Sequence, residues 1–466
     1  MGASLIANHK RFICSSCGHQ EIKWSGRCPD CATWNTLEEQ IISIDKSRNK
    51  VTNSKNKKAP IKLSEVVTSN SDRLITGINE FDRTMGGGIV KDSVTILSAK
   101  PGAGKSTLLL QVANSIALQG LKVLYASGEE SDSQIKKRAD RLFNSINDNV
   151  WLLSDTSMDN VLQTISKIDA DLVIIDSIQT FTLEEYMGSR AGSPTQTMEC
   201  ANELVRLAKD ADRPRAVIMT GQQNKNEELT GLRALEHLVD AVIVIDGEEE
   251  EELRGLLVSK NRFGSTWERG FFSMAETGMV SIDNPSQFFM TKRGTEDLVS
   301  GSALTVIKEG SRPIIVEIES LVSKTLLPYP SRTGECLKRE QMITLLSILE
   351  QRGKIALFDK DVVLKTTGGI KVKEQAVNLA VMMSIVSSVK NKPIENDTIF
   401  IADVGLTGEL KKVPSLEMRI KEIDRMGYRK VLIAKDAIMR DLDFKNIKIL
   451  EFKTLKEVIN NIFGQA

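Results

Sequence analysis

A glycine-rich segment at residues 99–107 carries the clearest chemical pattern in the chain. It follows an apolar run and matches the phosphate-binding pattern G-x-x-x-x-G-K-[ST] at every fixed position except Ala99. Its two glycines allow backbone N–H groups to point at phosphate oxygens, while Lys105 supplies a positive charge and Ser106 a hydroxyl ligand for Mg²⁺. We therefore predict a site for ATP and Mg²⁺ that comprises Ala99, Lys100, Pro101, Gly102, Ala103, Gly104, Lys105, Ser106 and Thr107.

Two further apolar runs lead into carboxylates. Residues 172–175 are apolar and precede Asp176, and a carboxylate at the end of such a strand lies beside Mg²⁺ in P-loop enzymes. Asp176 is thus the second predicted magnesium ligand, with Ser106. Another apolar run ends shortly before Glu129 and Glu130, and hydrolysis needs a group that positions water near the γ-phosphate. We predict Glu129 for this role and keep Glu130 as the alternative, because either can instead be a charge at a helix N-terminus.

Four of the six cysteines form two C-x-x-C pairs near the N-terminus. Four thiolates at this spacing close a tetrahedral site around a structural Zn²⁺ ion, and so small a module depends on the metal for folding. Two disulfides are the alternative interpretation. We expect Trp24 and Trp34 to form the apolar core of the module. The predicted zinc ligands are Cys14, Cys17, Cys28 and Cys31, whereas Cys200 and Cys336 are expected to be packing residues.

The composition is that of a globular protein without an overall charge to attract a partner. Lys and Arg together number 62, as do Asp and Glu, so any contact with nucleic acid must come from a local patch. Apolar residues make up 41% of the chain and charged residues 27%, and no apolar run is long enough to cross a membrane. No signal-peptide core begins the sequence, which predicts a cytoplasmic protein.

These motifs require an α/β fold with more than one domain. From residue 63 to residue 285, short apolar strands alternate with helical patterns, which is typical of a mostly parallel sheet covered on both faces. We expect a zinc module at 1–44, a linker at 45–62, an ATPase domain at 63–285 and a third domain at 286–466. The expected strands are 93–97, 122–126, 172–175, 216–220, 241–245, 305–308 and 313–319, and the expected helices include 134–143, 197–210, 341–351 and 372–389.

Four ordered motifs resemble the bacterial RadA (Sms) family of DNA repair proteins. They are the cysteine module up to residue 37, the segment TGI…GGGIV at 76–90, SGEES at 127–131 and the pentapeptide KNRFG at 260–264. The resemblance covers nearly the whole chain. It implies a RecA-like ATPase that binds single-stranded and branched DNA and drives branch migration as a helicase. It also implies a homo-oligomeric, hexameric ring and a RecA-type recombinase as a partner.

The pentapeptide contains two cations that complete the predicted catalytic set. Lys260 and Arg262 are two positions apart, so a strand places both on one face. At a subunit boundary they can reach a neighbour's γ-phosphate, with Arg262 as an arginine finger and Lys260 as its companion. Contact with a DNA backbone and a surface ion pair are the alternatives. The predicted catalytic residues are therefore Lys105, Glu129, Asp176, Lys260 and Arg262.

Residues 221–234 fall where RecA-like proteins have a DNA-binding loop. Lys225 and Arg233 are the candidate phosphate contacts, and Gly231 is a candidate hinge. Members of the family usually have the sequence His-Val-Thr after the first glycine, whereas this chain has Gln222-Gln223-Asn224. An ordinary polar surface loop is the alternative interpretation of this segment.

The C-terminal region resembles the Lon protease domain, as the family's own C-terminal region does. Residues 405–410 match a strand–turn segment of that domain. The Lon nucleophile is expected near Ala376 and the Lon lysine near Glu417, and neither residue can serve in a Ser–Lys dyad. The resemblance implies a scaffold for ring assembly and for DNA binding through Lys411, Lys412, Arg419 and Lys421.

The function predicted from these features is an ATP-driven DNA motor, a branch-migration helicase of homologous recombination and DNA repair. One alternative is a nucleotide-switched adaptor that binds DNA or a recombinase without translocating. Another is an ATP-dependent Lon-type protease, against which the missing dyad argues.

Overall fold

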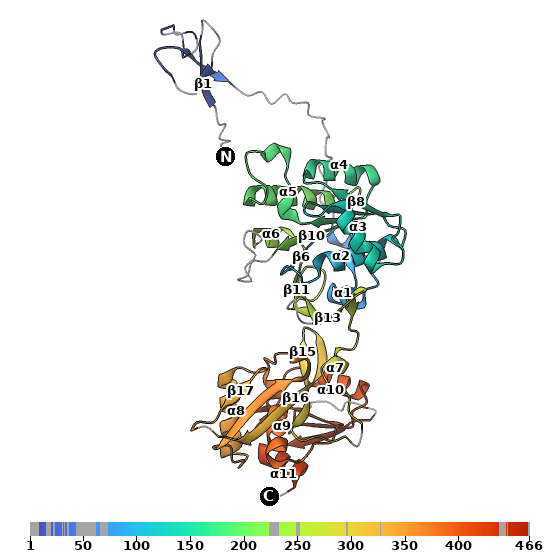
Figure 1. Ribbon diagram of the computed structural model, residues 1–466, viewed down its shortest axis with the longest axis vertical. Helices are drawn as coiled ribbons and strands as arrows, with labels where there is room; N and C mark the ends of the chain where they lie inside the picture. The colour runs from blue at the N-terminus through green and yellow to red at the C-terminus, as the bar shows by residue number, and fades with distance from the viewer. Residues whose placement is uncertain are drawn as a thin grey trace. The chain divides into compact units, whose positions relative to one another are not determined.

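The computed structural model describes residues 9–14, 20–21, 24–29, 31, 33–34, 37–42, 62–65, 73–222, 233–247, 252–294, 297–326, 328–437, 444 and 446–464. The chain divides into two compact units, Met1–Thr68 and Ser69–Ala466. The first unit contains a small antiparallel sheet in the order β2-β1-β3 (Figure 1). Its strands are β1 (His9–Cys14), β2 (Gln20–Glu21) and β3 (Leu37–Ile42).

The second unit begins with the predicted ATPase domain, which is built on a nine-stranded sheet. Its strands are β6 (Val94–Ala99), β7 (Val123–Ser127), β8 (Val150–Ser154), β9 (Leu172–Asp176), β10 (Ala216–Gln222), β11 (Ala241–Asp246), β12 (Leu253–Asn261), β13 (Glu268–Ala275) and β14 (Gly278–Ser281). Their order is β14-β13-β12-β11-β6-β10-β9-β7-β8. The strands from β11 to β8 are parallel, and β12 to β14 extend the sheet in antiparallel fashion.

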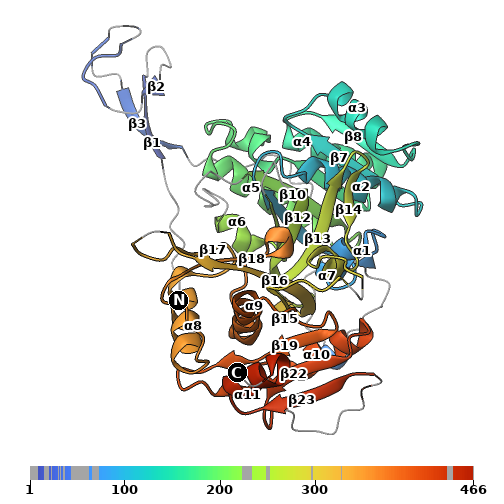
Figure 2. The same ribbon diagram turned by 60° about the horizontal axis from the view of Figure 1, so that its bottom comes forward.

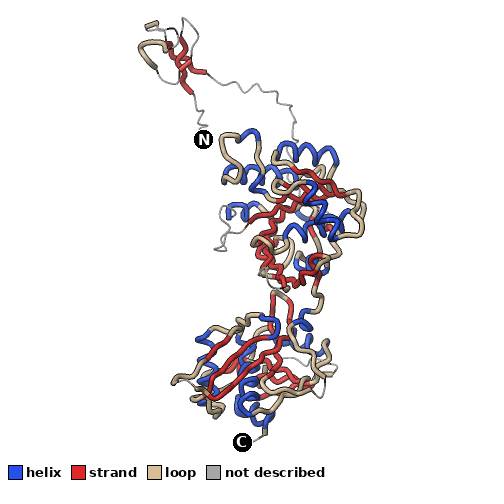
Figure 3. Tube along the Cα trace, viewed as in Figure 1, coloured by secondary structure: helices blue, strands red, loops and turns tan. Residues whose placement is uncertain are grey.

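Helices cover both faces of this sheet, because its central strands are apolar on both sides. Every residue of β6, β7 and β9 is buried. Figure 3 shows the strands of this domain between helical layers. One core contains residues of α1 (Asn79–Thr84), α2 (Lys105–Ala117) and α3 (Asp132–Leu142), and the other contains residues of α4 (Met158–Ile168), α5 (Pro194–Ala208) and α6 (Arg233–Leu238).

The rest of this unit is a second α/β domain with a seven-stranded mixed sheet in the order β17-β18-β16-β15-β19-β22-β23. Its strands are β15 (Ser302–Glu309), β16 (Arg312–Lys324), β17 (Arg332–Gly334), β18 (Lys360–Thr366), β19 (Thr398–Ile401), β22 (Lys430–Ala434) and β23 (Lys448–Phe452). One core includes residues of α8 (Arg339–Gln351), α9 (Asn378–Lys390) and α11 (Leu455–Phe463), and the other includes α10 (Leu416–Arg425) (Figure 2).

Five further short strands and helices belong to the second unit. They are the paired strands β4 (Arg73–Leu74) and β5 (Ile89–Val90), the helix α7 (Pro285–Phe288), and the hairpin β20 (Asp403–Val404) and β21 (Leu410–Lys411). Among the described residues, no helix combines the length and the apolar character needed to cross a membrane.

The α/β fold class predicted from the sequence is confirmed, with one correction. The five strands predicted for the ATPase domain end within two residues of β6, β7, β9, β10 and β11. The helix expected from residue 372 begins only at Asn378, because Gln375–Val377 form a 3₁₀ turn. Strand β8 and the antiparallel strands β12 to β14 were not predicted.

The turn between β15 and β16 contacts the ATPase domain through two buried carboxylates. Glu80 accepts hydrogen bonds from Arg83 at 3.0 Å and from Arg312 at 2.6 Å. Glu268 accepts one from Arg83 at 3.1 Å and one from the backbone N–H of Ser311 at 3.0 Å. The two carboxylate side chains are only 3% and 7% exposed. Residues of the second domain therefore help to compensate charges that are buried in the ATPase domain.

Candidate nucleotide site

The phosphate-binding segment lies between the end of β6 and the start of α2. β6 ends at Ala99, and α2 begins at Lys105 with Gly104 as its N-cap residue. Gly102 and Gly104 have φ angles of 79° and 101°, which residues with a Cβ rarely adopt. A Cβ on Gly104 would also lie 2.7 Å from Met274 Cε. The loop thus needs glycine at these positions, and the first N–H groups of α2 are available to an anion.

Asp176 ends β9 and accepts hydrogen bonds from three hydroxyl groups. Ser106 Oγ donates to Oδ2 at 2.9 Å, Tyr125 Oη to the same oxygen at 2.6 Å, and Thr220 Oγ1 to Oδ1 at 2.7 Å. Burial, and then the negative charge of Asp176, raise the pKa of Tyr125 well above its usual value, so the phenol remains a donor. Ser106 and Asp176, the predicted magnesium ligands, are therefore in direct contact. Their hydroxyl and carboxylate oxygens are the ligand types that Mg²⁺ prefers.

Sequence reasoning missed Tyr125 and Thr220. Each is a hydroxyl-bearing residue in a mostly apolar strand, two residues before the last residue of that strand. That combination was the available signal, since the carboxyl ends of parallel strands form the ligand-binding edge of such a sheet.

Lys105 places a partly buried ammonium group beside two carboxylates. Burial is the main cause that lowers the pKa of Lys105, and the negative charges of Asp176 and Glu129 oppose that shift. Its Nζ lies 3.4 Å from the backbone oxygen of Ala99, at the start of the loop. The ammonium group is thus held at the loop that would cradle phosphates.

The two neighbouring glutamates have different surroundings. Both carboxylate oxygens of Glu130 accept hydrogen bonds from the Arg138 guanidinium at 2.7 Å, which ties Glu130 to α3. Glu129 Oε1 instead accepts a hydrogen bond from Ser177 Oγ at 2.5 Å, next to Asp176 in the chain. Its charge also acts on Lys105. This geometry favours Glu129 over Glu130 as the residue that faces the nucleotide.

Lys260 and Arg262 lie at the other end of the sheet. Lys260 Nζ donates to the backbone oxygen of Glu236, and Arg262 Nη1 lies 3.0 Å from Asp240 Oδ1. The other oxygen of Asp240 accepts a hydrogen bond from the N–H of Val94, the first residue of β6. β6 is six residues long, so roughly 16 Å of strand separates this cluster from the phosphate-binding loop. The structure therefore does not bring these two cations to the nucleotide site of their own subunit.

Comparisons with known proteins identify the family of the chain. Residues 60–228 match the family described as an AAA domain, and residues 12–39 match the rubredoxin metal binding domain. The DNA repair protein RadA of Streptococcus pyogenes serotype M3 is 39% identical over 453 residues, which cover 97% of this chain and 98% of the relative. RadA of Bacillus subtilis is 37% identical over 457 residues, with the same two coverages.

The chain belongs to the RadA family of DNA repair proteins. Two solved structures also align with it, each over 45% of this chain. A KaiC-like protein of Pyrococcus horikoshii has a TM-score of 0.38 at 20% identity, with 98% of it covered. The RadB recombinase has a TM-score of 0.36 at 21% identity and is covered completely, at 100%. The family resemblance predicted from the sequence motifs is confirmed by the RadA relatives.

The predicted zinc ligands of this RadA-family chain lie within the rubredoxin-type match. Cys28 is buried, Cys31 is exposed, Cys14 is the last residue of β1, and Cys17 lies outside the described residues. The four-thiolate site therefore stays a prediction. The described residues contain no group of three or more candidate metal ligands.

The prediction that Trp24 and Trp34 form a small apolar core is wrong. Their side chains are 58% and 69% exposed. The Arg27 guanidinium instead lies over the Trp34 ring, 5.8 Å from its centroid, in a cation–π contact at the surface.

The other two cysteines of the RadA-family chain are packing residues, as predicted. Cys200 is 0% and Cys336 3% exposed. Burial raises the pKa of Cys200 to about 12 and that of Cys336 to about 11. Both thiols therefore stay protonated at neutral pH and are poor nucleophiles.

The loop predicted to bind DNA is largely outside the described residues. Lys225 and Gly231 fall within the part that is not described, and so does the side chain of Arg233, whose backbone begins α6. The predicted role of this loop therefore remains a prediction.

The second domain places the two positions of the missing Lon-type dyad on different elements. Ala376 is buried in the 3₁₀ turn Gln375–Val377, and Glu417 lies in the first turn of α10. Residues 405–410 connect β20 to β21, which agrees with the expected strand–turn. An alanine at this buried position offers no nucleophile.

Arg419 is a correction to the predicted DNA-binding surface. Its side chain is only 1% exposed, and Nη1 donates to Glu374 Oε1 at 2.9 Å and Nη2 to Oε2 at 2.5 Å. It also donates to the backbone oxygen of Val306. A buried guanidinium must be paired in this way, so Arg419 is a structural residue. The remaining predicted contacts are exposed lysines: Lys411, Lys412 and Lys421.

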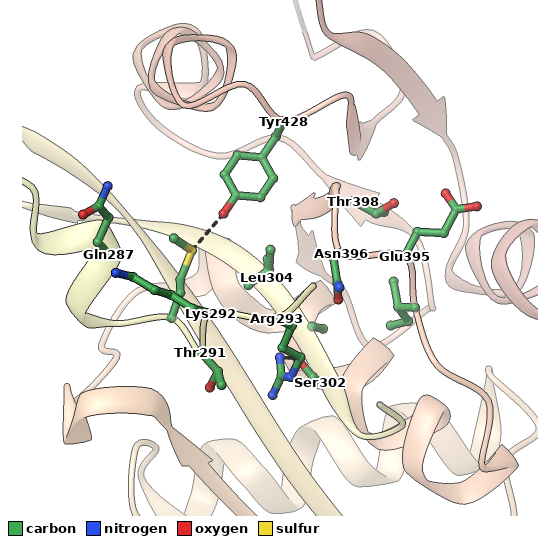
Figure 4. A pocket seen from close by; sticks show the side chains of 13 residues that line it. Gln287, Thr291, Lys292, Arg293, Ser302, Leu304, Glu395, Asn396, Thr398 and Tyr428 are labelled. Atoms are coloured by element: carbon green, nitrogen blue, oxygen red, sulfur yellow. Dashed lines mark hydrogen bonds between the residues drawn. The ribbon is translucent and has the colours of Figure 1, made fainter. Parts of the chain in front are cut away.

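A separate pocket of about 300 Å³ lies within the second domain (Figure 4). The Tyr428 hydroxyl donates to Met290 Sδ at 3.0 Å on one side of it. Arg293, which also lines the pocket, is bound to the buried carboxylate of Glu317. Neither position of the missing dyad lines this pocket, so it is unrelated to Lon-type chemistry.

Proposed function

We propose that this chain is an ATP-driven DNA motor of homologous recombination and DNA repair, a branch-migration helicase that acts on single-stranded and branched DNA. The observation that carries the proposal is the contact between Ser106 and Asp176 beside Lys105, which supports a P-loop nucleotide site in a RadA-family chain. ATP hydrolysis is the enzymatic activity that such a site supports.

Each residue of the site has a role in this proposal. Lys105 binds the β- and γ-phosphates, and Ser106 and Asp176 hold the magnesium ion. Bound Mg²⁺ supplies charge neutralisation on the phosphates. Glu129 accepts a hydrogen bond from the attacking water and aligns it with the γ-phosphate. To do so its carboxylate exchanges the Ser177 hydroxyl for that water, which costs little because one neutral donor replaces another.

The position of Arg262 supports action on a neighbouring subunit. It lies at the opposite end of β6 from its own phosphate-binding loop, is half exposed, and is held by Asp240. In a ring of identical subunits with head-to-tail contacts, the edge that carries Arg262 can face the next subunit's nucleotide. We propose a homo-hexameric ring in which Arg262, with Lys260 as its companion, stabilises the transferred phosphoryl group in trans. Contact with the DNA backbone and a surface ion pair, of which the contact with Asp240 is an example, are the alternative roles.

We further propose that the second domain is a Lon-protease-like scaffold without protease activity. Alanine at position 376 and glutamate at position 417 support this, since they remove the nucleophile and the amine base. The exposed lysines Lys411, Lys412 and Lys421 are its proposed phosphate contacts, now without Arg419. The zinc module is proposed to bind Zn²⁺ and to serve recruitment by a RecA-type recombinase.

ATP hydrolysis with and without single-stranded DNA tests the proposal, combined with a mass measurement in the presence of nucleotide. We expect DNA to stimulate hydrolysis, a hexameric mass, and ATP-dependent movement of a labelled three-stranded branch. Nucleotide binding with DNA-independent turnover and no branch movement would instead support a nucleotide-switched adaptor. Digestion of casein would overturn the assignment of the second domain as inactive.

A further inference from the structure

Tyr125 carries a hydroxyl group into the buried interior of the ATPase domain. Its side chain is 1% exposed, and it lies in β7 between the apolar residues Leu124 and Ala126. Burial of a hydroxyl in such surroundings is unfavourable unless the group is hydrogen-bonded. Its Oη is 2.6 Å from Asp176 Oδ2, and a bond to a carboxylate is stronger than one between neutral groups.

The strand register explains how donors reach Asp176 from both sides. β9 lies between β10 and β7 in the sheet. Met219 of β10 pairs with Ile175, so Thr220 lies alongside Asp176 and its short side chain reaches Oδ1 directly. The donor from β10 is therefore a residue at the same level as the carboxylate.

The donor from β7 lies at an earlier level along the strands than Asp176, so its side chain must be longer. Tyr125 pairs with Ile174, two residues before Asp176, which is a step of about 7 Å along the strand. Residues at i and i+2 share one face of a sheet, so the Tyr125 ring runs along the face on which Asp176 lies. Tyrosine is long enough to span this step. Ser106 reaches the same carboxylate from α2.

We propose that Tyr125 is a positioning residue that fixes the rotation of the Asp176 carboxylate, so that Asp176 and Ser106 meet the magnesium ion in a single geometry. The inference rests on the function proposed above. With Oδ1 held from β10 and Oδ2 held from β7, two rigid strands set the plane of the carboxylate. Loss of the Tyr125 hydroxyl would leave Ser106 to hold Oδ2, although Ser106 is itself a predicted ligand and must adjust when the ion binds.

The test is Tyr125→Phe, which keeps the ring in the core and removes only the donor. Binding of a fluorescent ATP analogue is measured by anisotropy, without Mg²⁺ and over a Mg²⁺ titration, on the same protein. We expect the magnesium-free affinity to be unchanged and the apparent Mg²⁺ affinity to fall about tenfold, as for other residues that orient a metal ligand. ATP turnover at low Mg²⁺ should fall likewise and recover when Mg²⁺ is raised. A merely structural role would change both affinities together and would show no such recovery.

Tyr428→Phe is the matched control, because it removes a tyrosine hydroxyl that donates to Met290 in the second domain. It should behave as the wild type. An equal loss in Tyr428→Phe, or an unchanged Mg²⁺ affinity in Tyr125→Phe, would overturn the inference and leave the proposed function standing. A wild-type protein without Mg²⁺-dependent nucleotide binding would overturn the proposed function itself.

Thr220→Val provides a second variant if Tyr125→Phe fails to fold. It has nearly the same shape and removes the donor to Oδ1. We expect the same selective loss of Mg²⁺ affinity. Wild-type Mg²⁺ affinity in this variant would show that the carboxylate needs no fixing by its neighbouring strands, which also overturns the inference.

Discussion

Strand β6 has a charged cluster near each end, and the two clusters are balanced in different ways. At the carboxyl end, the Asp176 and Glu129 carboxylates accept hydrogen bonds from neutral hydroxyls, and Lys105 is the partly buried cation beside them. At the amino end, the buried carboxylate of Asp240 is held by the cations of Lys209, at 2.8 Å, and Arg262, at 3.0 Å. At one end of the strands, two carboxylates are therefore bound mainly by neutral donors, whereas at the other end the carboxylate is already paired with cations.

The comparison teaches how a P-loop domain can share its catalytic groups between subunits. The groups that would bind nucleotide are assembled within one chain, whereas the conspicuous Lys-x-Arg pair is at the far edge. Arg138 is the arginine near the carboxyl-end cluster, and it is tied to Glu130. Four variants test this contrast, and they are described in order of decreasing expected effect.

Lys105→Ala should abolish ATP turnover, because it removes the cation at the phosphate-binding loop. We expect a loss of at least about 1,000-fold, more than for the removal of one neutral donor. Steady-state hydrolysis and thermal unfolding measure the effect and confirm the fold. Wild-type turnover in a folded Lys105→Ala protein would mean that the carboxyl-end cluster is not the nucleotide site.

Arg262→Ala should lower hydrolysis about 1,000-fold, the lower range for an arginine finger, although the residue lies at the opposite edge of its own sheet. Mixing two inactive variants distinguishes action on a neighbouring subunit from action within one subunit. Inactive Arg262→Ala and inactive Lys105→Ala subunits should regain activity together, since mixed rings contain some intact interfaces.

Two results together would assign Arg262 to DNA binding instead. They are no recovery of activity in rings shown to contain both variants, and loss of DNA binding by the Arg262→Ala protein alone. Full activity of Arg262→Ala would leave Arg138 as the arginine to examine next.

Glu129→Gln should retain ATP binding and lose hydrolysis by about 100-fold, because a neutral amide accepts the hydrogen bond that aligns the attacking water more weakly than a carboxylate does. Glu130→Gln is the matched control one residue away. It weakens the bidentate pair with Arg138 and should reduce stability modestly while hydrolysis persists. If Glu130→Gln traps ATP and Glu129→Gln does not, their roles must be exchanged.

Cys28→Ser, or chelation of zinc, should have the smallest effect on hydrolysis, because Cys28 belongs to a different compact unit from the ATPase core. Basal turnover should survive while partner recruitment or the stimulation by DNA declines. Metal analysis of freshly purified, reduced protein should find one zinc ion per chain. Its absence would end the four-thiolate interpretation.

The sequence predicted those parts of the site whose signal is local. Ala99 to Thr107 and Asp176 stand out because a strand, a loop and a carboxylate follow one another in fixed order. Tyr125 and Thr220 were missed because their role depends on lateral register between strands that lie far apart in the chain. Local pattern cannot supply that register.

The error about Arg419 has a similar cause. In an amphipathic helix, an arginine resembles a solvated cation when only its residue type is considered, although its chain neighbours Met418 and Ile420 are apolar. Its burial follows from Glu374, which is 45 residues earlier in the chain and reaches it only after the sheet has formed. The prediction for Trp24 and Trp34 was wrong in the opposite direction, because these side chains were expected to be buried and are exposed. A large apolar side chain is not necessarily buried in so small a module.

The junction at the β15–β16 turn has a consequence for any attempt to divide the chain. A fragment that stops at residue 285 keeps Glu80 and Glu268 but loses Arg312 and the N–H of Ser311. Loss of one partner from a buried ion pair destabilises a protein by about 3–5 kcal/mol. Truncation at residue 285, the boundary predicted from the sequence, would therefore separate the buried carboxylates from two of their partners. A fragment that retains the hairpin up to Lys324 would carry its own neutralising charges, and truncation experiments on this chain should begin from that length.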